Sequence, residues 1–136
     1  MGASILVIDD DAIVRETVHQ ILENAGYEVI CADNGERGLD AFRARRPDLV
    51  VTDIIMPERD GIGTMLEMRR EWPGAPIVAI SGGGRLANTE YLDMARKLGA
   101  NDVLTKPFEP EELIEAVARC LPGRSAAVAR TDRDRQ

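Results

Sequence analysis

Three consecutive aspartates, Asp9, Asp10 and Asp11, follow a short apolar run near the N-terminus, and Asp53 ends another apolar run. Carboxylates that lie close together repel one another, and a cation or a lysine relieves that repulsion. Mg²⁺ takes a few carboxylates and keeps several waters, so we expect Asp9, Asp10 and Asp53 to form a partial Mg²⁺ site. Calcium is the second choice, because these acids are too few and too scattered for the ligand-rich loop that it usually favours.

A hydroxyl and an ammonium group complete this set of chemical groups. Ser81 ends a third apolar run, and Lys106 follows a fourth, directly before Pro107. An open Mg²⁺ site beside a hydroxyl and an ammonium suits phosphoryl transfer, in which the protein mainly positions groups and neutralises charge. One carboxylate must then accept the phosphoryl group. We expect this to be Asp53, because the other groups can converge on the end of its strand, and aspartyl phosphates are known covalent forms of carboxylates.

Short β-branched apolar runs alternate with longer segments of helical period along the chain. In the first helical segment apolar residues recur at steps of three and four, and Gly26 follows its end as a stop signal. The expected strands are Ser4–Asp9, Tyr27–Ala32, Asp48–Asp53, Ala75–Ser81 and Asp102–Thr105. The expected helices are Asp11–Ala25, Glu36–Arg46, Gly61–Trp72, Leu86–Leu98 and Pro110–Leu121.

The alternation of strands and helices predicts βαβ crossovers, and hence an α/β fold with five parallel strands and helices on both faces. The strands are continuously apolar, which agrees with burial on both sides of a parallel sheet. Such sheets bind ligands at the carboxyl ends of their strands. The acids, the hydroxyl and the lysine all follow strands at that edge, so the fold itself is expected to gather them into one pocket.

The composition excludes several classes of function. Apolar residues make up 44% of the chain, which suits a globular domain, and 17 basic against 24 acidic residues give a net charge of −7. An acidic surface repels phosphate backbones, and no basic recognition helix is visible, so we expect no direct nucleic-acid binding. No apolar run approaches the roughly 20 residues that span a bilayer, and no signal peptide is visible. We therefore expect a cytoplasmic protein without membrane contact.

The chain divides into a domain over residues 1–121 and a tail over residues 122–136. The tail carries four arginines among small and acidic residues and has little to bury, so we expect it to be mobile. A tail that binds a partner is the alternative interpretation.

The ordered set of polar residues resembles the receiver domain of bacterial response regulators in two-component signalling, over roughly residues 4–121. The motifs that carry the resemblance are Asp9-Asp10, Asp53 with Met56-Pro57 and Asp60-Gly61, Ser81, and Lys106-Pro107-Phe108. Each motif is common alone, but the ordered set is specific. The resemblance implies a flavodoxin-like (βα)5 sheet with the strand order 2-1-3-4-5.

By this resemblance, Asp53 receives its phosphoryl group from a sensor histidine kinase or a histidine phosphotransfer protein. Asp10, Asp53 and the backbone carbonyl of Ile55 would bind Mg²⁺ directly, and Asp9 would help through water. The chain would be a phosphoacceptor switch that assists its own phosphorylation and dephosphorylation, and not an enzyme acting on other substrates.

The resemblance also implies how the phosphoryl group is held and read. Lys106 would hold a phosphate oxygen beside a cis Lys106–Pro107 bond, and Ser81 would move to hydrogen-bond the phosphate. That movement would shift the Gly82–Gly84 turn and an output face formed by the last two helices and the last strand. The family usually has an aromatic residue three positions before the lysine. Val103 stands there in this chain, so ring rotation cannot report phosphorylation.

No DNA-binding or catalytic sequence follows residue 121, so we expect the output to be contact with a downstream protein or a phosphorelay. Two other classes of function stay open. One is an interaction module on the same fold that works without phosphate. The other is a flavin-binding or hydrolytic enzyme, against which stands the absence of a GxxxxGK or GxGxxG motif.

Overall fold

The computed structural model describes residues 2–54, 61–81, 93, 96–97 and 99–121. Within them, five parallel strands form one sheet in the order β2-β1-β3-β4-β5, which confirms the predicted fold. The strands are β1 (Ser4–Ile8), β2 (Glu28–Ala32), β3 (Leu49–Asp53), β4 (Ile77–Ser81) and β5 (Asp102–Thr105). The helices are α1 (Ala12–Asn24), α2 (Gly35–Arg45), α3 (Gly61–Glu71) and α5 (Pro110–Cys120).

Each of these elements begins and ends within two residues of its predicted bounds. The helix predicted over Leu86–Leu98 lies largely outside the described residues, as do the Gly82–Gly84 turn and the tail over residues 122–136. Within the described part of the chain, no helix is both long and apolar enough to cross a bilayer.

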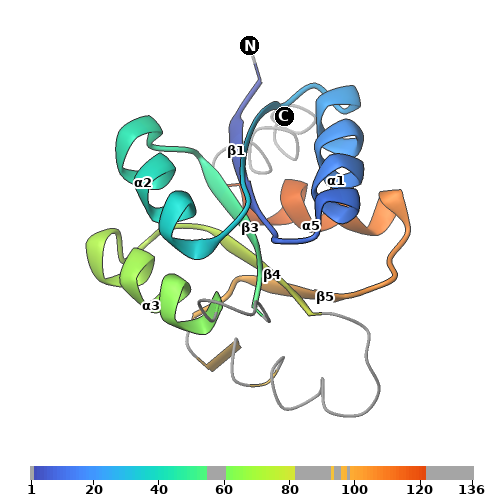
Figure 1. The fold of residues 1–136 in the computed structure, drawn as a ribbon. Helices are drawn as coiled ribbons and strands as arrows, with labels where there is room; N and C mark the ends of the chain where they lie inside the picture. The colour runs from blue at the N-terminus through green and yellow to red at the C-terminus, as the bar shows by residue number, and fades with distance from the viewer. Residues whose placement is uncertain (1, 55–60, 82–92, 94–95, 98, 122–136) are drawn as a thin grey trace, which may run out of the picture.

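The sheet separates two apolar cores. Figure 1 shows α2 and α3 on one side of the sheet and α1 and α5 on the other. Leu6 and Ile8 of β1 belong to the core beneath α2 and α3, whereas Ile5 and Val7 belong to the core beneath α1 and α5. Successive side chains of a strand point to opposite faces, so β1 contributes to both cores in turn. The central strands β1, β3 and β4 are therefore buried on both sides, as their sequences predict.

Asp11 ends the short connection between β1 and α1 by capping the helix. Its carboxylate accepts hydrogen bonds from the backbone amides of Ile13 over 2.9 Å and of Val14 over 3.4 Å. These amides have no partner within the helix, so an aspartate at this position stabilises the first turn. Only Asp9, Asp10 and Asp11 separate β1 from α1. This short connection, the β1–α1 loop, holds the first two acids close to the end of β1.

Helix α2 packs closely on β1 at Gly38. A Cβ atom at this position would lie 2.4 Å from Cδ1 of Ile8, which is far inside van der Waals contact. Ile8 is buried and is the last residue of β1, directly before Asp9. The glycine therefore sets the spacing between α2 and the strand end that carries the acids.

Candidate functional site

The strand register brings the predicted site residues to one edge of the sheet. Asp53 ends β3, and its partner on β4 is the residue before Ser81. On the other side, the residue before Asp9 pairs with the residue before Asp53. Lys106 follows β5, and its backbone amide donates to the carbonyl of Ser81 over 2.9 Å. Asp9, Asp53, Ser81 and Lys106 thus occupy consecutive strand ends.

Lys106 joins two buried carboxylates. Its Nζ lies 3.2 Å from Oδ2 of Asp9 and 3.0 Å from Oδ2 of Asp53. Asp9 is 2% exposed and Asp53 is 3% exposed, so neither carboxylate can rely on bulk water for solvation. A buried charge is stable only when it is paired and hydrogen-bonded. In this arrangement Lys106 is the positive partner that permits two carboxylates to lie together.

Asp10 completes the acidic group. Carboxylate oxygens of Asp9, Asp10 and Asp53 all lie within 4.8 Å of one another, and Asp10 is exposed whereas the other two are buried. Such a set is open to solvent on one side, and it supplies a few hard oxygen ligands while leaving room for water. These are the properties of a Mg²⁺ site. The carbonyl of Ile55, the fourth expected ligand, lies outside the described residues.

Burial raises the pKa of Asp9 above its ordinary value. The negative charge of Asp53 acts in the same direction, while the amide of Asp11 and the ammonium of Lys106 oppose it. For Lys106, burial alone would lower the pKa, but its hydrogen bond to Asp53 and the charges of Asp53 and Asp9 raise it. The lysine is therefore an ammonium ion at neutral pH. The burial of Asp9 and the neighbouring charge of Asp53 both act against a negative charge on Asp9, and a bound cation would act against them.

Ser81 is fully buried at the end of β4. Val103 is half-buried on β5, at the edge of the sheet, and packs against the core beneath α2 and α3. The peptide bond between Lys106 and Pro107 is cis, which confirms that expectation. The structure thus brings the predicted side chains to one edge of the sheet, namely Asp9, Asp10, Asp53, Ser81 and Lys106. Ile55 and the Gly82–Gly84 turn lie outside the described residues, so the predictions for them stay untested.

Arg15 is a site residue that the sequence patterns do not single out. Its Nη1 donates to the backbone carbonyl of Asp9 over 2.8 Å. A signal was nevertheless present, because Arg15 is a basic residue in the first turn of α1, where the helix dipole favours acids. A basic residue in that position requires another reason, and here the reason is a contact with the β1–α1 loop.

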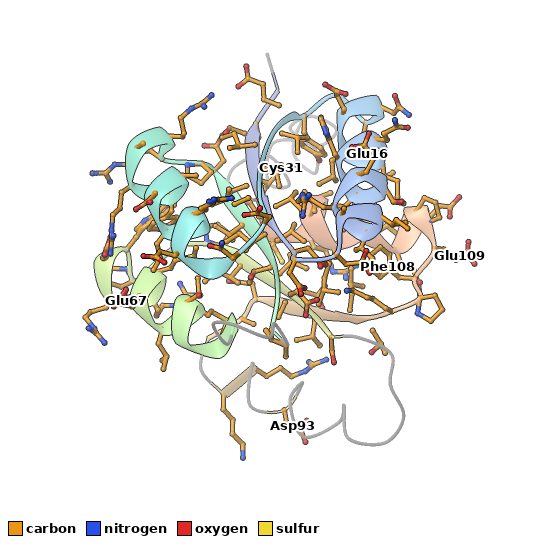
Figure 2. The ribbon with its side chains drawn as sticks, viewed as in Figure 1. Glu16, Cys31, Glu67, Asp93, Phe108 and Glu109 are labelled. Atoms are coloured by element: carbon orange, nitrogen blue, oxygen red, sulfur yellow. The ribbon has the colours of Figure 1, made fainter. Side chains whose placement is uncertain are left out.

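An apolar groove adjoins the site on its α1 side. It has a volume of about 390 Å³, and Figure 2 shows Phe108, one of its lining residues, near the N-terminal end of α1. Ile13 is 77% exposed, the most exposed of the large apolar side chains that the structure describes. Lys106 belongs to both the groove and the acidic site. The groove is lined by Ile13, Val14, Thr17, Val18, Lys106, Pro107 and Phe108.

Comparison with known sequences gives a consistent result. A sequence model of the response regulator receiver domain matches residues 5–118. The chain is 37% identical over 118 residues to the chemotaxis protein CheY of Thermotoga maritima, which covers 86% of this chain and 96% of that protein. It is 41% identical over 109 residues to the probable transcriptional regulator ycf27 of Porphyra purpurea, covering 80% of this chain and 43% of that protein. The chain therefore spans less than half the length of this regulator.

Solved structures agree with the sequence comparison. A response regulator receiver domain protein from Clostridium thermocellum superposes with a TM-score of 0.83 at 28% identity, covering 91% of this chain and 98% of that one. The receiver domain of NtrX from Brucella abortus superposes with a TM-score of 0.82 at 35% identity, covering 88% and 98%.

Proposed function

This chain belongs to the family of response regulator receiver domains, and from that premise we propose that it is a phosphorylation switch with Asp53 as the phosphoacceptor. The phosphodonor is a phosphohistidine on a sensor histidine kinase or on a histidine phosphotransfer protein. One observation carries the proposal: Lys106 contacts Asp53 and Asp9 together, at the strand edge where a third carboxylate lies within reach. This arrangement places an ammonium group beside the carboxylate that acts as the nucleophile in the proposal.

The transfer is a displacement at phosphorus. An oxygen of Asp53 forms a bond to the phosphorus atom as the bond from phosphorus to the donor nitrogen breaks. The electron pair of the broken bond stays on the imidazole. Lys106 already lies 3.0 Å from Oδ2 of Asp53, so its charge faces the oxygens on which negative charge accumulates. The buried hydroxyl of Ser81, at the neighbouring strand end, is the group assigned to hydrogen-bond the transferred phosphate.

Asp9, Asp10 and Asp53 fit a magnesium ion by their donor chemistry and their opening to water. In the proposal Asp10 and Asp53 would hold the ion directly, and Asp9 would help to hold it through water. When bound, Mg²⁺ supplies positive charge that neutralises the phosphoryl oxygens. The chain's own acids orient this charge, and the chain acts on no other substrate than the phosphoryl group that it receives and releases.

The groove beside Lys106 supports a protein as the phosphodonor. A partner that covers an exposed apolar side chain such as that of Ile13 removes apolar surface from water, which lowers the free energy of the complex. The groove also reaches Lys106, so a partner seated there stands beside the phosphoacceptor. A small phosphodonor would need no such surface.

We assign the chain to the cytoplasm and its output to contact with a downstream protein or to a phosphorelay. Relatives such as ycf27 are more than twice as long as the region that matches this chain. That the receiver works without the remaining part of such a relative is therefore a proposal and not a finding.

The proposal is tested by incubation with acetyl phosphate and Mg²⁺, followed by intact-mass measurement. We expect the wild type to gain the mass of one phosphoryl group and Asp53→Asn to gain none. Asp40→Asn is the matched control, because Asp40 is an exposed aspartate on α2. It should be labelled like the wild type.

Other results would favour the alternatives. A wild type that stays unlabelled but copurifies with flavin would support a flavin protein on the same fold. A wild type that stays unlabelled and carries no cofactor would support a phosphate-independent interaction module. Labelling that persists in Asp53→Asn would move the phosphoacceptor to another residue.

A further inference from the structure

The two acids of the β1–α1 loop are held in different ways. Asp9 is buried, and its amide donates to the carbonyl of Ala32 over 3.2 Å at the end of β2. Its carboxylate accepts hydrogen bonds from the amide of Asp11 over 2.9 Å and from Lys106. Asp10 is exposed, so packing does not fix its position. Its place depends instead on the peptide that joins it to Asp9.

Arg15 contacts that peptide. Its Nη1 lies 2.8 Å from the carbonyl oxygen of Asp9, which belongs to the same rigid plane as the amide of Asp10. Among the residues that the structure describes, no other side chain donates to the backbone of Asp9, Asp10 or Asp11. The guanidinium therefore restricts rotation of the plane from which Asp10 extends.

The geometry of α1 explains why Arg15 reaches the loop. Side chains of a helix lean towards its N-terminus, and Arg15 lies in the first turn. The capping bonds of Asp11 fix the helix start, so the Arg15 side chain reaches back from a defined position. A charged donor to a carbonyl is stronger than a neutral one.

We propose that Arg15 is a positioning residue for metal binding, which orients the Asp9–Asp10 peptide so that the Asp10 carboxylate is placed for a divalent cation. The inference rests on the metal site of the proposed function. Arg15 does not touch the cation in this proposal. It acts through the backbone, and its charge by itself would oppose a cation nearby.

Because the orienting role of Arg15 and its positive charge have opposite effects on cation affinity, the direction in which the affinity changes distinguishes them. Substitution Arg15→Met removes the donor and the positive charge but keeps an apolar stem of similar length. If only charge mattered, the variant would bind a divalent cation more tightly than the wild type. If orientation matters, it binds more weakly, by about tenfold as for other residues that hold a metal ligand in place.

Arg37→Met is the matched control. Arg37 lines the same polar pocket as Arg15, beside Cys31, but its guanidinium pairs with Asp33 and does not contact the β1–α1 loop. The control loses the same charge and should bind the cation as well as the wild type or slightly better. Arg15→Lys keeps the charge and one donor group, so its affinity should lie between those of the wild type and Arg15→Met.

The measurement is binding of Mn²⁺ to the full chain without any phosphodonor. The loss of the electron paramagnetic resonance signal of free Mn²⁺ reports the amount bound. A second measurement follows acetyl phosphate labelling against Mg²⁺ concentration. There, Arg15→Met should raise the half-saturating Mg²⁺ concentration by the same factor and leave the rate at saturation within about twofold of the wild type.

The possible outcomes separate the two proposals. Arg15→Met binding Mn²⁺ as tightly as the wild type overturns the role of Arg15 alone. A wild type that binds no Mn²⁺ overturns the metal site, and the role of Arg15 with it. If urea unfolding shows that Arg15→Met is not folded, the comparison of Arg15→Lys with the wild type decides, because both keep the positive charge at this position. Weaker binding by Arg15→Lys supports the role, and equal binding overturns it.

Discussion

Substitution of Lys106 by methionine tests the electrostatics of the site most directly. The change removes both hydrogen bonds from Nζ, at 3.2 Å to Asp9 and 3.0 Å to Asp53, and leaves two buried carboxylates side by side. An exposed ion pair would contribute about 0–1 kcal/mol to the free energy of unfolding. Removing one member of a buried pair costs about 3–5 kcal/mol. Here the carboxylates are buried, but the lysine side chain is 18% exposed, so we expect the lower end, about 3 kcal/mol.

The assay is urea unfolding at neutral pH without divalent cations, followed by the far-ultraviolet circular dichroism signal. Lys97→Met is the matched control, because Lys97 is the other lysine of the chain and is exposed. Its free energy of unfolding should stay within about 0.5 kcal/mol of the wild type. Added Mg²⁺ should narrow the difference in free energy of unfolding between Lys106→Met and the wild type, because the acids that have lost their ammonium should bind the cation more tightly, and a ligand stabilises the folded state that it binds.

The pH dependence follows from the raised pKa of Asp9. A carboxyl group whose pKa is higher in the folded than in the unfolded state stabilises the fold at low pH, and this stability is lost as the pH rises through the folded value. Removing Lys106 takes away a cation that opposes the rise. The loss in free energy of unfolding caused by Lys106→Met should therefore be full at neutral pH and should shrink as the pH falls and the carboxyl group of Asp9 takes up a proton. A difference in free energy of unfolding between Lys106→Met and the wild type that is below about 1 kcal/mol at neutral pH, or that does not change with pH, would refute this reasoning.

Three further expectations concern packing and recognition. Gly38→Ala should lower the free energy of unfolding by about 1–2 kcal/mol, because the clash with Ile8 of β1 outweighs the gain in helix propensity. Gly63→Ala should raise it by about 0.5–1 kcal/mol, because a Cβ atom there would meet open space. Equal effects of the two substitutions in urea unfolding would contradict the close approach of α2 to β1. Arg69→Met should lower the free energy of unfolding by about 2–3 kcal/mol, because the guanidinium of Arg69 donates to three backbone carbonyls. Arg70→Met is the control and should change the free energy of unfolding little, because Arg70 is exposed. Ile13→Ser should slow phosphorylation by a phosphohistidine protein about tenfold and leave labelling by acetyl phosphate unchanged. A time course of phosphorylation with each donor measures this. Equal slowing with both donors would show that the partner does not bind in the groove.

The fold was readable from the sequence because its local signals agree with one another. Continuous apolar strands alternate with helices of one apolar face, and glycine or proline stands at the ends of most elements. The position of Asp9, Asp53, Ser81 and Lys106 at one edge followed from topology alone, since parallel strands end on the same side. The strand order came from a family resemblance, because periodicity does not determine which strands are neighbours.

Contacts between side chains were harder to predict. The bond from Arg15 to the carbonyl of Asp9 depends on the position of the first turn of α1 to within one residue, which periodicity does not give. The second contact of Lys106, to Asp9, depends on how far the lysine chain extends across the sheet edge. The groove beside Ile13 is a product of packing between α1 and the segment after β5, which lie far apart in the sequence.

The place of each strand in the sheet has a consequence for how the site opens. β5 is an edge strand with a neighbour on one side only, whereas β1 and β3, which carry Asp9 and Asp53, lie between two strands. Elements with fewer buried contacts open first, so backbone amides of β5 should exchange with deuterium faster than those of the central strands. Lys106 directly follows β5, so an opening of this strand that extends to Lys106 would separate its ammonium from Asp9 and Asp53. Deuterium exchange at the end of β5 would then report the fraction of molecules in which the two buried carboxylates lack their positive partner.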